Sequence, residues 1–168
     1  QQLSTAVADR NVDELVALVA NDVRLDFGGG EGANLLRTHL MQSDRSLWDE
    51  LTEALALGCA KNGQGGITLP WYFDQDFGSI DPMAGMIVEG ENVPLRSAPD
   101  KTAEPVTTLS WDVVQLTDGL RPDVAFQKVR LGDNKTEGFI ETGLLRSLMG
   151  YRVIASSRNG KWSITTIA

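Results

Sequence analysis

The strongest constraint on the fold comes from one stretch, YRVIASSRNGKWSITTIA, residues 151–168. Asn159 and Gly160 lie near its centre, between two segments in which apolar and polar residues alternate. Asn-Gly is the dipeptide best suited to a type I′ turn, because both turn positions need a positive φ. Residues 151–168 are therefore predicted to form an antiparallel β-hairpin.

The first sixty residues carry helix signals instead. Asn11 followed by Glu14, and Ser46 followed by Asp49, have the spacing of helix N-terminal caps, and Gly58 fits a helix end. Apolar residues recur at helical spacing behind both caps. A short extended piece closed by glycines separates the first two helices. Helices are predicted at residues 11–22, 33–40 and 43–58, and the extended piece at 23–32.

From residue 67 onward the chain consists of short apolar pieces that Gly, Pro, Asp and Asn separate. This spacing is typical of a small barrel or sandwich. Pro94 cannot donate to a sheet, so it is expected at an edge or an unpaired position. The fold class is predicted to be α+β, with a mainly helical segment 1–82, a small β-barrel 84–149 and a hairpin 150–168 that joins the N-terminal part.

Charge and composition argue against several classes of partner. The 168 residues have a formal net charge of −8, one cysteine and one histidine. Nucleic-acid binding usually needs a basic patch, and no run of Lys or Arg is present. No apolar run approaches the roughly 18–20 residues of a membrane span. We therefore expect no nucleic acid, no membrane span, no metal and no cofactor.

Residues 86–148 also resemble the bacterial SH3-like domain family. The pieces that carry the resemblance are, in order, ENVPLRSAP, PVTTLSWDVVQL, FQKV and EGFIETGLLR. Two positions where the family often has Trp hold Phe126 and Phe139, and Ser110-Trp111-Asp112 replaces a turn glycine. The resemblance implies an SH3-like barrel that binds peptidoglycan peptides or another envelope protein.

The remainder of the chain is similar to a group of exported bacterial proteins. That likeness implies that residues 151–168 belong with the N-terminal part and that the barrel is inserted between Trp71 and Tyr151. It also hints at half of a cystatin-like cone. We accordingly expect an exported, periplasmic protein whose leader has been removed.

Catalytic and metal sites have weak support in the sequence. Cys59 and His39 could form a thiol–imidazole pair, but Cys59 follows a predicted helix end, where the helix dipole disfavours a thiolate. Asp74, Asp76 and Asp81 offer three oxygen donors, without the spacing of a calcium loop. They are expected to form turns. The stretch FGGGEG, 27–32, lacks the Lys-Ser/Thr of a phosphate loop.

Aromatic residues are the best binding candidates. Trp111 is preferred, because it falls at a turn where a barrel needs no apolar residue. Arg96 is expected to meet a ligand carboxylate or, preferably, to pair with Asp100 or Asp112. The candidate ligand-binding residues are Trp111, Arg96, Phe126, Phe139, Trp71 and Tyr72.

Three functions are therefore open. The first is a non-catalytic binding module of the cell envelope. The second is a small-molecule pocket between the N-terminal helices and the last hairpin, lined by Trp48, Trp71, Tyr72 and Trp162. The third is a hydrolase that uses Cys59 or the carboxylate loop. We prefer the first and name no catalytic residue.

Overall fold

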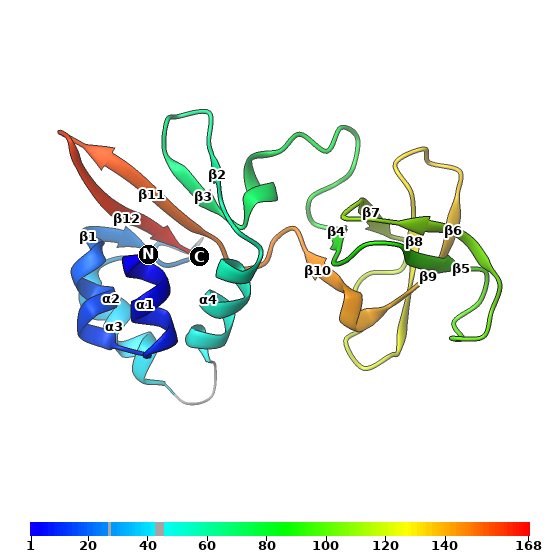
Figure 1. Cartoon of the computed structure of the whole chain (residues 1–168), viewed down its shortest axis with the longest axis horizontal. Coiled ribbons are helices and arrows are strands. Elements are labelled where there is room, and N and C mark those ends of the chain that lie inside the picture. The colour runs from blue at the N-terminus through cyan, green and yellow to red at the C-terminus, as the bar shows by residue number, and fades with distance from the viewer. Residues whose placement is uncertain (27, 43–45) are drawn as a thin grey trace. The chain divides into compact units, whose positions relative to one another are not determined.

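The computed structural model, which describes residues 1–26, 28–42 and 46–168, divides the chain into two units. Unit 1 contains Gln1–Gln75 and Tyr151–Ala168, and unit 2 contains Asp76–Gly150. Unit 1 is therefore made of two separate pieces of chain, and unit 2 of the continuous piece between them (Figure 1).

The described residues of unit 1 form four short helices: α1 (Gln2–Ala8), α2 (Val12–Leu18), α3 (Ala33–Met41) and α4 (Leu47–Ala56). Both predicted caps are confirmed, since the Asn11 side chain accepts from the Glu14 N–H and the Ser46 side chain from the Asp49 N–H. Gly58 follows the end of α4 with a positive φ, as a helix-ending glycine does. The predicted helix start at 43–45 and residue 27 lie outside the described residues.

Five strands form the sheet of unit 1, in the order β1-β12-β11-β3-β2. Their bounds are β1 (Val19–Arg24), β2 (Ala60–Lys61), β3 (Ile67–Leu69), β11 (Val153–Arg158) and β12 (Lys161–Ile167). β1 runs parallel to β12, and the other neighbours are antiparallel. Arg158 pairs with Lys161 across Asn159 and Gly160, and both turn residues have a positive φ, which fits the predicted turn.

The core of unit 1 lies between the helices and this sheet, with the helices together on one side of it (Figure 1). Leu15, Leu36 and Leu51 from three helices are fully buried with Val23 of β1. Ile164 of the last strand joins the same cluster. Burial of these apolar side chains ties the late hairpin to the early helices.

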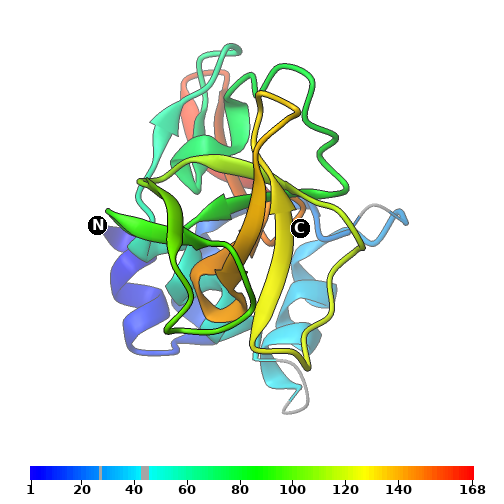
Figure 2. The same ribbon diagram turned by 90° about the vertical axis from the view of Figure 1, so that its right-hand side faces the viewer.

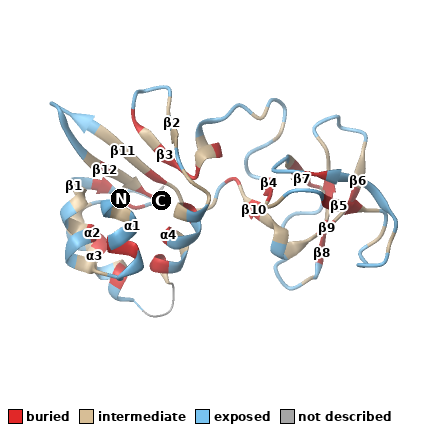
Figure 3. Cartoon of the chain, in the orientation of Figure 1, coloured by how far each residue is buried: buried red, intermediate tan, exposed pale blue. Residues whose placement is uncertain are grey.

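Seven antiparallel strands form the sheet of unit 2, in the order β10-β4-β7-β8-β9-β5-β6 (Figure 2). They are β4 (Gly85–Val88), β5 (Val93–Arg96), β6 (Pro105–Leu109), β7 (Val113–Leu116), β8 (Phe126–Arg130), β9 (Glu137–Glu141) and β10 (Leu145–Ser147). Their inward residues make a separate core that includes Val88, Leu95, Val114, Val129 and Ile140 (Figure 3).

Pro94 lies in β5 at a position that needs no donor. It is registered with Thr108 of β6, whereas β9 pairs with β5 only at Arg96. Proline lacks an N–H, so the Pro94–Thr108 pair must be one that exchanges no hydrogen bonds. Toward β9, Pro94 has no partner in the register of the described strands. It therefore occupies an unpaired position, as predicted.

The predicted α+β class with a mainly helical 1–82 and a closed barrel is wrong. The described residues form sheets of five and seven strands and four short helices, so the structure is mostly β. Residues 19–24, predicted as the end of a helix and the start of an extended piece, are one strand, because they find a partner in distant β12. In unit 2, whose residues are all described, β10 and β6 end the strand order without pairing, so the sheet is not a closed barrel.

Short 3₁₀ turns complete both units: Trp71–Asp74 after β3, and Thr142–Leu144 before β10. The first interrupts what was predicted as a single strand over 67–73, because Pro70 ends β3 at Leu69. Among the described residues, no helix is both long enough and apolar enough to cross a bilayer.

Candidate functional site

The turn between β6 and β7 presents Trp111 to solvent. Trp111 has a φ of 57°, a left-handed conformation that is unusual for a bulky side chain. Of its surface, 38% is exposed. Its N–H donates to the Gly90 carbonyl at 3.0 Å. Trp111 therefore lies between β6 and β7, at the turn position expected from the sequence, and its backbone is held in place.

Neighbouring residues fix the same turn. The Ser110 N–H donates to the Asp112 carboxylate at 2.8 Å, and the Ser110 hydroxyl accepts from the Asn92 N–H at 2.9 Å. The Val88 N–H donates to the Asp112 carbonyl at 2.9 Å. These bonds tie the turn to the loop between β4 and β5, so that the indole is displayed from a preorganised backbone.

The strand next to this turn is the edge of the sheet. β6 follows β5 in the strand order and has no second neighbour among the described strands. Pro105 to Thr108 are exposed, and only Leu109 is buried. Because the Pro94–Thr108 pair exchanges no hydrogen bonds, the N–H and C=O of Thr108 point away from β5. A free edge of this kind can accept an extended peptide.

Arg96 does not face an open groove. Its guanidinium donates to the Ala103 carbonyl at 2.9 Å. The pKa of Asp100 is lowered, mainly because the Thr102 N–H and hydroxyl donate to its carboxylate, and the nearby Arg96 charge contributes least. Arg96 thus stabilises the loop between β5 and β6 through the Ala103 carbonyl, and its pairing with Asp100 or Asp112 stays a prediction.

Strand register places Arg96 and two of the predicted aromatic residues on one sheet face. Phe139 pairs with both Arg96 and Lys128, and Phe126 is two residues before Lys128 in β8, on the same side. Phe126 is only 9% exposed and Phe139 is half-buried. This is the outer face, opposite the core that contains Val129. Phe126 therefore offers little surface to a ligand.

Salt bridges occupy the same face. Glu137 pairs with Lys128 at 3.1 Å and with Arg130 at 2.6 Å. The pKa of the Glu137 carboxyl is lowered, first by the hydrogen bonds from Arg130 and then by those from Lys128. The outer face of β8 and β9 is therefore a network of paired charges, unlike the turn that holds Trp111.

Trp71 and Tyr72 belong to unit 1, so they are described apart from Trp111. Tyr72 is 1% exposed and meets Trp71 edge-on, with ring centroids 5.9 Å apart. Phe73 stacks on Tyr72, with ring centroids 6.0 Å apart, and lies 4.4 Å from the Arg152 guanidinium. The pKa of Arg152 is lowered because the group is partly buried. This cluster packs the end of β3.

The predicted pocket between four aromatic residues is not assembled as expected. Trp48 is buried, with its indole N–H donating to the Leu40 carbonyl at 3.1 Å, and Tyr72 is buried in the cluster above. Trp162 is 53% exposed on β12. Two of the four residues therefore have side chains used for packing.

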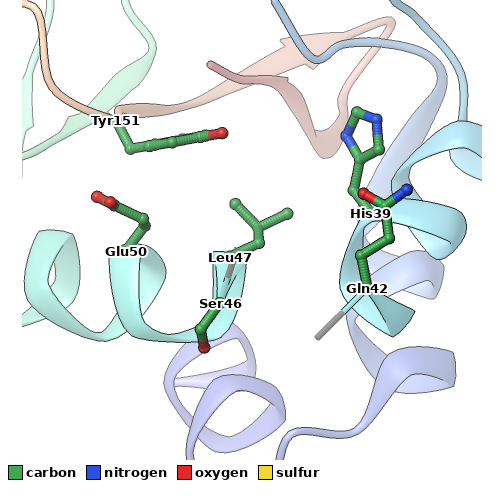
Figure 4. A pocket seen from close by; sticks show the side chains of 6 residues that line it. All are labelled: His39, Gln42, Ser46, Leu47, Glu50 and Tyr151. Carbon is green, nitrogen blue, oxygen red and sulfur yellow. The ribbon is translucent and has the colours of Figure 1, made fainter. Parts of the chain in front are cut away.

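A pocket does exist elsewhere in unit 1, with a volume of about 330 Å³ (Figure 4). It lies between the end of α3, the start of α4 and the residue that precedes β11 by two positions. Its lining consists of His39, Gln42, Ser46, Leu47, Glu50 and Tyr151. Sequence reasoning missed this set, since Ser46, His39 and Tyr151 had been considered only for other reasons and never together.

Carboxylates near the candidate calcium loop are used in turns. Asp76 accepts from the Gly78 N–H at 2.8 Å, and Asp81 from the Met83 N–H at 2.9 Å. Asp74 accepts from the Gly63 N–H at 2.8 Å. The prediction of turns is confirmed for Asp76 and Asp81, whereas Asp74 binds the loop between β2 and β3. The described residues contain no group of three His, Cys, Asp or Glu side chains arranged to hold a metal ion.

The glycine-rich loop is organised by its own carboxylate. Asp26 accepts from the Gly28 N–H at 2.7 Å and the Gly30 N–H at 2.8 Å. Its pKa is lowered, chiefly by the hydrogen bond from the Gly30 N–H, and the electrostatic effect of nearby His39 contributes least. A carboxylate already occupies these amide donors, which disfavours a bound phosphate.

The thiol and the imidazole considered for catalysis lie on different elements. His39 is in the last turn of α3, and Cys59 is exposed after α4. No contact between them is present in the part of the chain that the structure describes.

Searches against protein-family models, curated proteins and solved structures each returned no match to this chain.

Proposed function

We propose that this chain is a non-catalytic binding module of the bacterial cell envelope. It takes an extended peptide, from the cell wall or from an envelope protein, at the turn that carries Trp111. The observation that carries the proposal is the exposed indole on a left-handed backbone. The envelope setting and the exported, periplasmic location rest on the resemblance of residues 86–148 to bacterial SH3-like domains.

The conformation of Trp111 supports a binding role on energetic grounds. A left-handed backbone costs a non-glycine residue roughly 1–2 kcal/mol. Glycine or asparagine would occupy this turn at lower cost. Strained residues are concentrated at binding and catalytic sites. An aromatic side chain that is kept there while exposed is most simply explained by contact with a partner.

The free edge of β6 supplies the second half of the site. A peptide that pairs with Thr108 would extend the sheet by one strand through main-chain hydrogen bonds. β6 ends at Leu109, only two residues before Trp111. The indole is therefore close in sequence to the end of the free edge. Main-chain pairing would provide affinity, and the aromatic surface would select side chains.

A pull-down on purified peptidoglycan sacculi tests the cell-wall branch of this proposal. We expect the wild-type chain to co-sediment and Trp111→Ala to bind at least about tenfold more weakly, as for an aromatic hot spot. Trp162→Ala is the matched control, because it removes another exposed indole, from unit 1. That control should bind as the wild type does.

Two outcomes would count against the proposal. Equal binding by wild type and Trp111→Ala would remove the indole from the site. If no sacculi are bound, a photo-crosslinking residue at position 111 should capture an envelope protein in living cells. Failure of both experiments would overturn the envelope-binding function.

A further inference from the structure

The pocket of unit 1 has walls that packing holds in place. Its floor is Leu47, which is 7% exposed and belongs to the core of unit 1. The next residue, Trp48, donates its indole N–H to the Leu40 carbonyl at 3.1 Å, which joins the start of α4 to the end of α3. Because both helices that line the pocket are tied together, a ligand would meet a largely preformed site.

The polar groups of the pocket stand at two ends. In Figure 4, Glu50 lies below the Tyr151 ring on one side, and His39 and Gln42 lie together on the other. The Tyr151 hydroxyl is directed toward the His39 side, and Leu47 stands between the two ends. Ser46 uses its hydroxyl oxygen to cap α4, where it accepts from the Asp49 N–H at 3.3 Å.

The charge of the lining favours a cation. Glu50 is the one carboxylate that lines the pocket in the described part of the chain, and Gln42, Ser46 and Tyr151 are neutral. His39, the remaining polar residue, lies near the Asp26 carboxylate. The whole chain carries a net charge of −8, which draws cations rather than anions toward it.

Two further features define the ligand. The Tyr151 ring lies beside Glu50, so a bound ammonium group could make a cation–π contact with the ring in addition to its ion pair with the carboxylate. At the other end, the His39 imidazole and the Gln42 amide can each donate or accept a hydrogen bond. The volume of about 330 Å³ is at the small end of ligand pockets, enough for a molecule of monosaccharide size.

We infer that this pocket binds a small hydroxylated amine, such as an amino sugar, with its ammonium group at Glu50 and its hydroxyl groups at His39 and Gln42. This is a second binding site, on a different unit from the Trp111 turn. It does not depend on the function proposed for that turn.

The test uses the full chain, labelled with ¹⁵N, and three related sugars, of which N-acetylglucosamine is the largest because of its acetyl group. Glucosamine carries the ammonium group at about pH 7, glucose replaces it with hydroxyl, and N-acetylglucosamine neutralises it. Backbone amide shifts at the end of α3 and the start of α4 should saturate with glucosamine. Both uncharged sugars should bind at least about tenfold more weakly.

Substitutions then locate the ammonium group. Glu50→Gln keeps the shape of the side chain and should reduce glucosamine affinity at least about tenfold, with glucose affinity unchanged. Glu53→Gln is the matched control, because it removes one carboxylate from the same helix outside the pocket, and it should bind as the wild type does. Gln42→Ala, at an exposed position, should weaken both sugars.

Three results would overturn the inference. One is the absence of a saturable shift at about 50 mM glucosamine. Another is equal affinity for glucose and glucosamine. The third is a folded Glu50→Gln variant that binds glucosamine like the wild type. Thermal unfolding of each variant establishes that the pocket is folded when binding is measured.

Discussion

At the residue scale, glycines differ sharply in how much space surrounds them. A Cβ at Gly138 in β9 would lie 2.6 Å from Leu95 Cγ and 2.7 Å from the Arg96 carbonyl oxygen. A Cβ at Gly132 would have nothing within 4 Å. Gly138 thus allows β9 to approach β5, whereas Gly132 has no such packing role.

Gly138→Ala is therefore expected to destabilise unit 2 by about 1–3 kcal/mol, since the backbone of β5 must move to make room. Urea denaturation followed by circular dichroism measures the free energy of unfolding. Gly132→Ala is the control and should stay within about 0.5 kcal/mol of the wild type. Equal stability of the two variants would show that β5 and β9 are less closely packed than described.

Residues with local functions were predictable from the sequence. Asn11 and Ser46 cap their helices through bonds to residues three positions later, and Asn159 accepts the positive φ that its turn requires. Each depends on a few neighbours in the chain. The left-handed conformation of Trp111 was not predictable, because it depends on Gly90, twenty-one residues away in sequence.

At the element scale, the junction of α2 and β1 shows where local patterns fail. Apolar spacing continues at helical period through Val19, so a helix was predicted to residue 22. The helix instead ends at Leu18, and Val19 pairs with Ile164 of β12. The β-branched valine suits a strand, and the partner that decides the matter is more than a hundred residues away.

The turn between β8 and β9 has its own acid sensitivity. Asp133 accepts from the Thr136 hydroxyl at 2.6 Å and from the N–H groups of Thr136 and Lys135. These bonds, the Thr136 hydroxyl first, lower the Asp133 pKa from 3.8 to about 2. A carboxyl whose pKa is lower in the folded state stabilises the fold above its unfolded pKa.

That contribution should disappear between about pH 4 and pH 2 as the carboxylate is protonated. Asp133→Asn cannot titrate, so the stability difference between wild type and Asp133→Asn should be largest above about pH 4 and shrink below it. Urea denaturation of both proteins across this range is the measurement. A difference that stays constant with pH would mean that the charge of Asp133 is unimportant to the turn.

At the scale of the whole molecule, the chain leaves unit 1 after Gln75 and returns at Tyr151. The returning residues supply β11 and β12, the two strands between β1 and β3. Deleting residues 151–168 should therefore leave unit 1 unfolded and unit 2 folded. Amide spectra of the truncated chain should retain the dispersed signals of residues 76–150 and lose those of residues 1–75.

A separately produced fragment of residues 76–150 is the reference for that comparison, because it has a continuous chain and its own core. Dispersed signals from α1 to α4 in the truncated chain would contradict the expectation. They would mean that the helices form a stable unit without the sheet that covers their apolar face.

The division of the chain into two units explains why one candidate site could be predicted from the sequence and the other could not. Trp111 could be proposed from a short turn, but Trp71 and Tyr72 were grouped with it although they belong to the other unit. The pocket joins residues of α3 and α4 to Tyr151, far later in the chain. Such a site follows from the return of the chain to unit 1, which no local pattern reveals.

The split of unit 1 also sets an order of events during synthesis. The ribosome completes residues 76–150 before it makes β11 and β12, so unit 2 can fold while unit 1 still lacks its central strands. The helices of unit 1 must wait, with apolar surface exposed, until the hairpin emerges. During this interval the first helices expose apolar surface that favours aggregation.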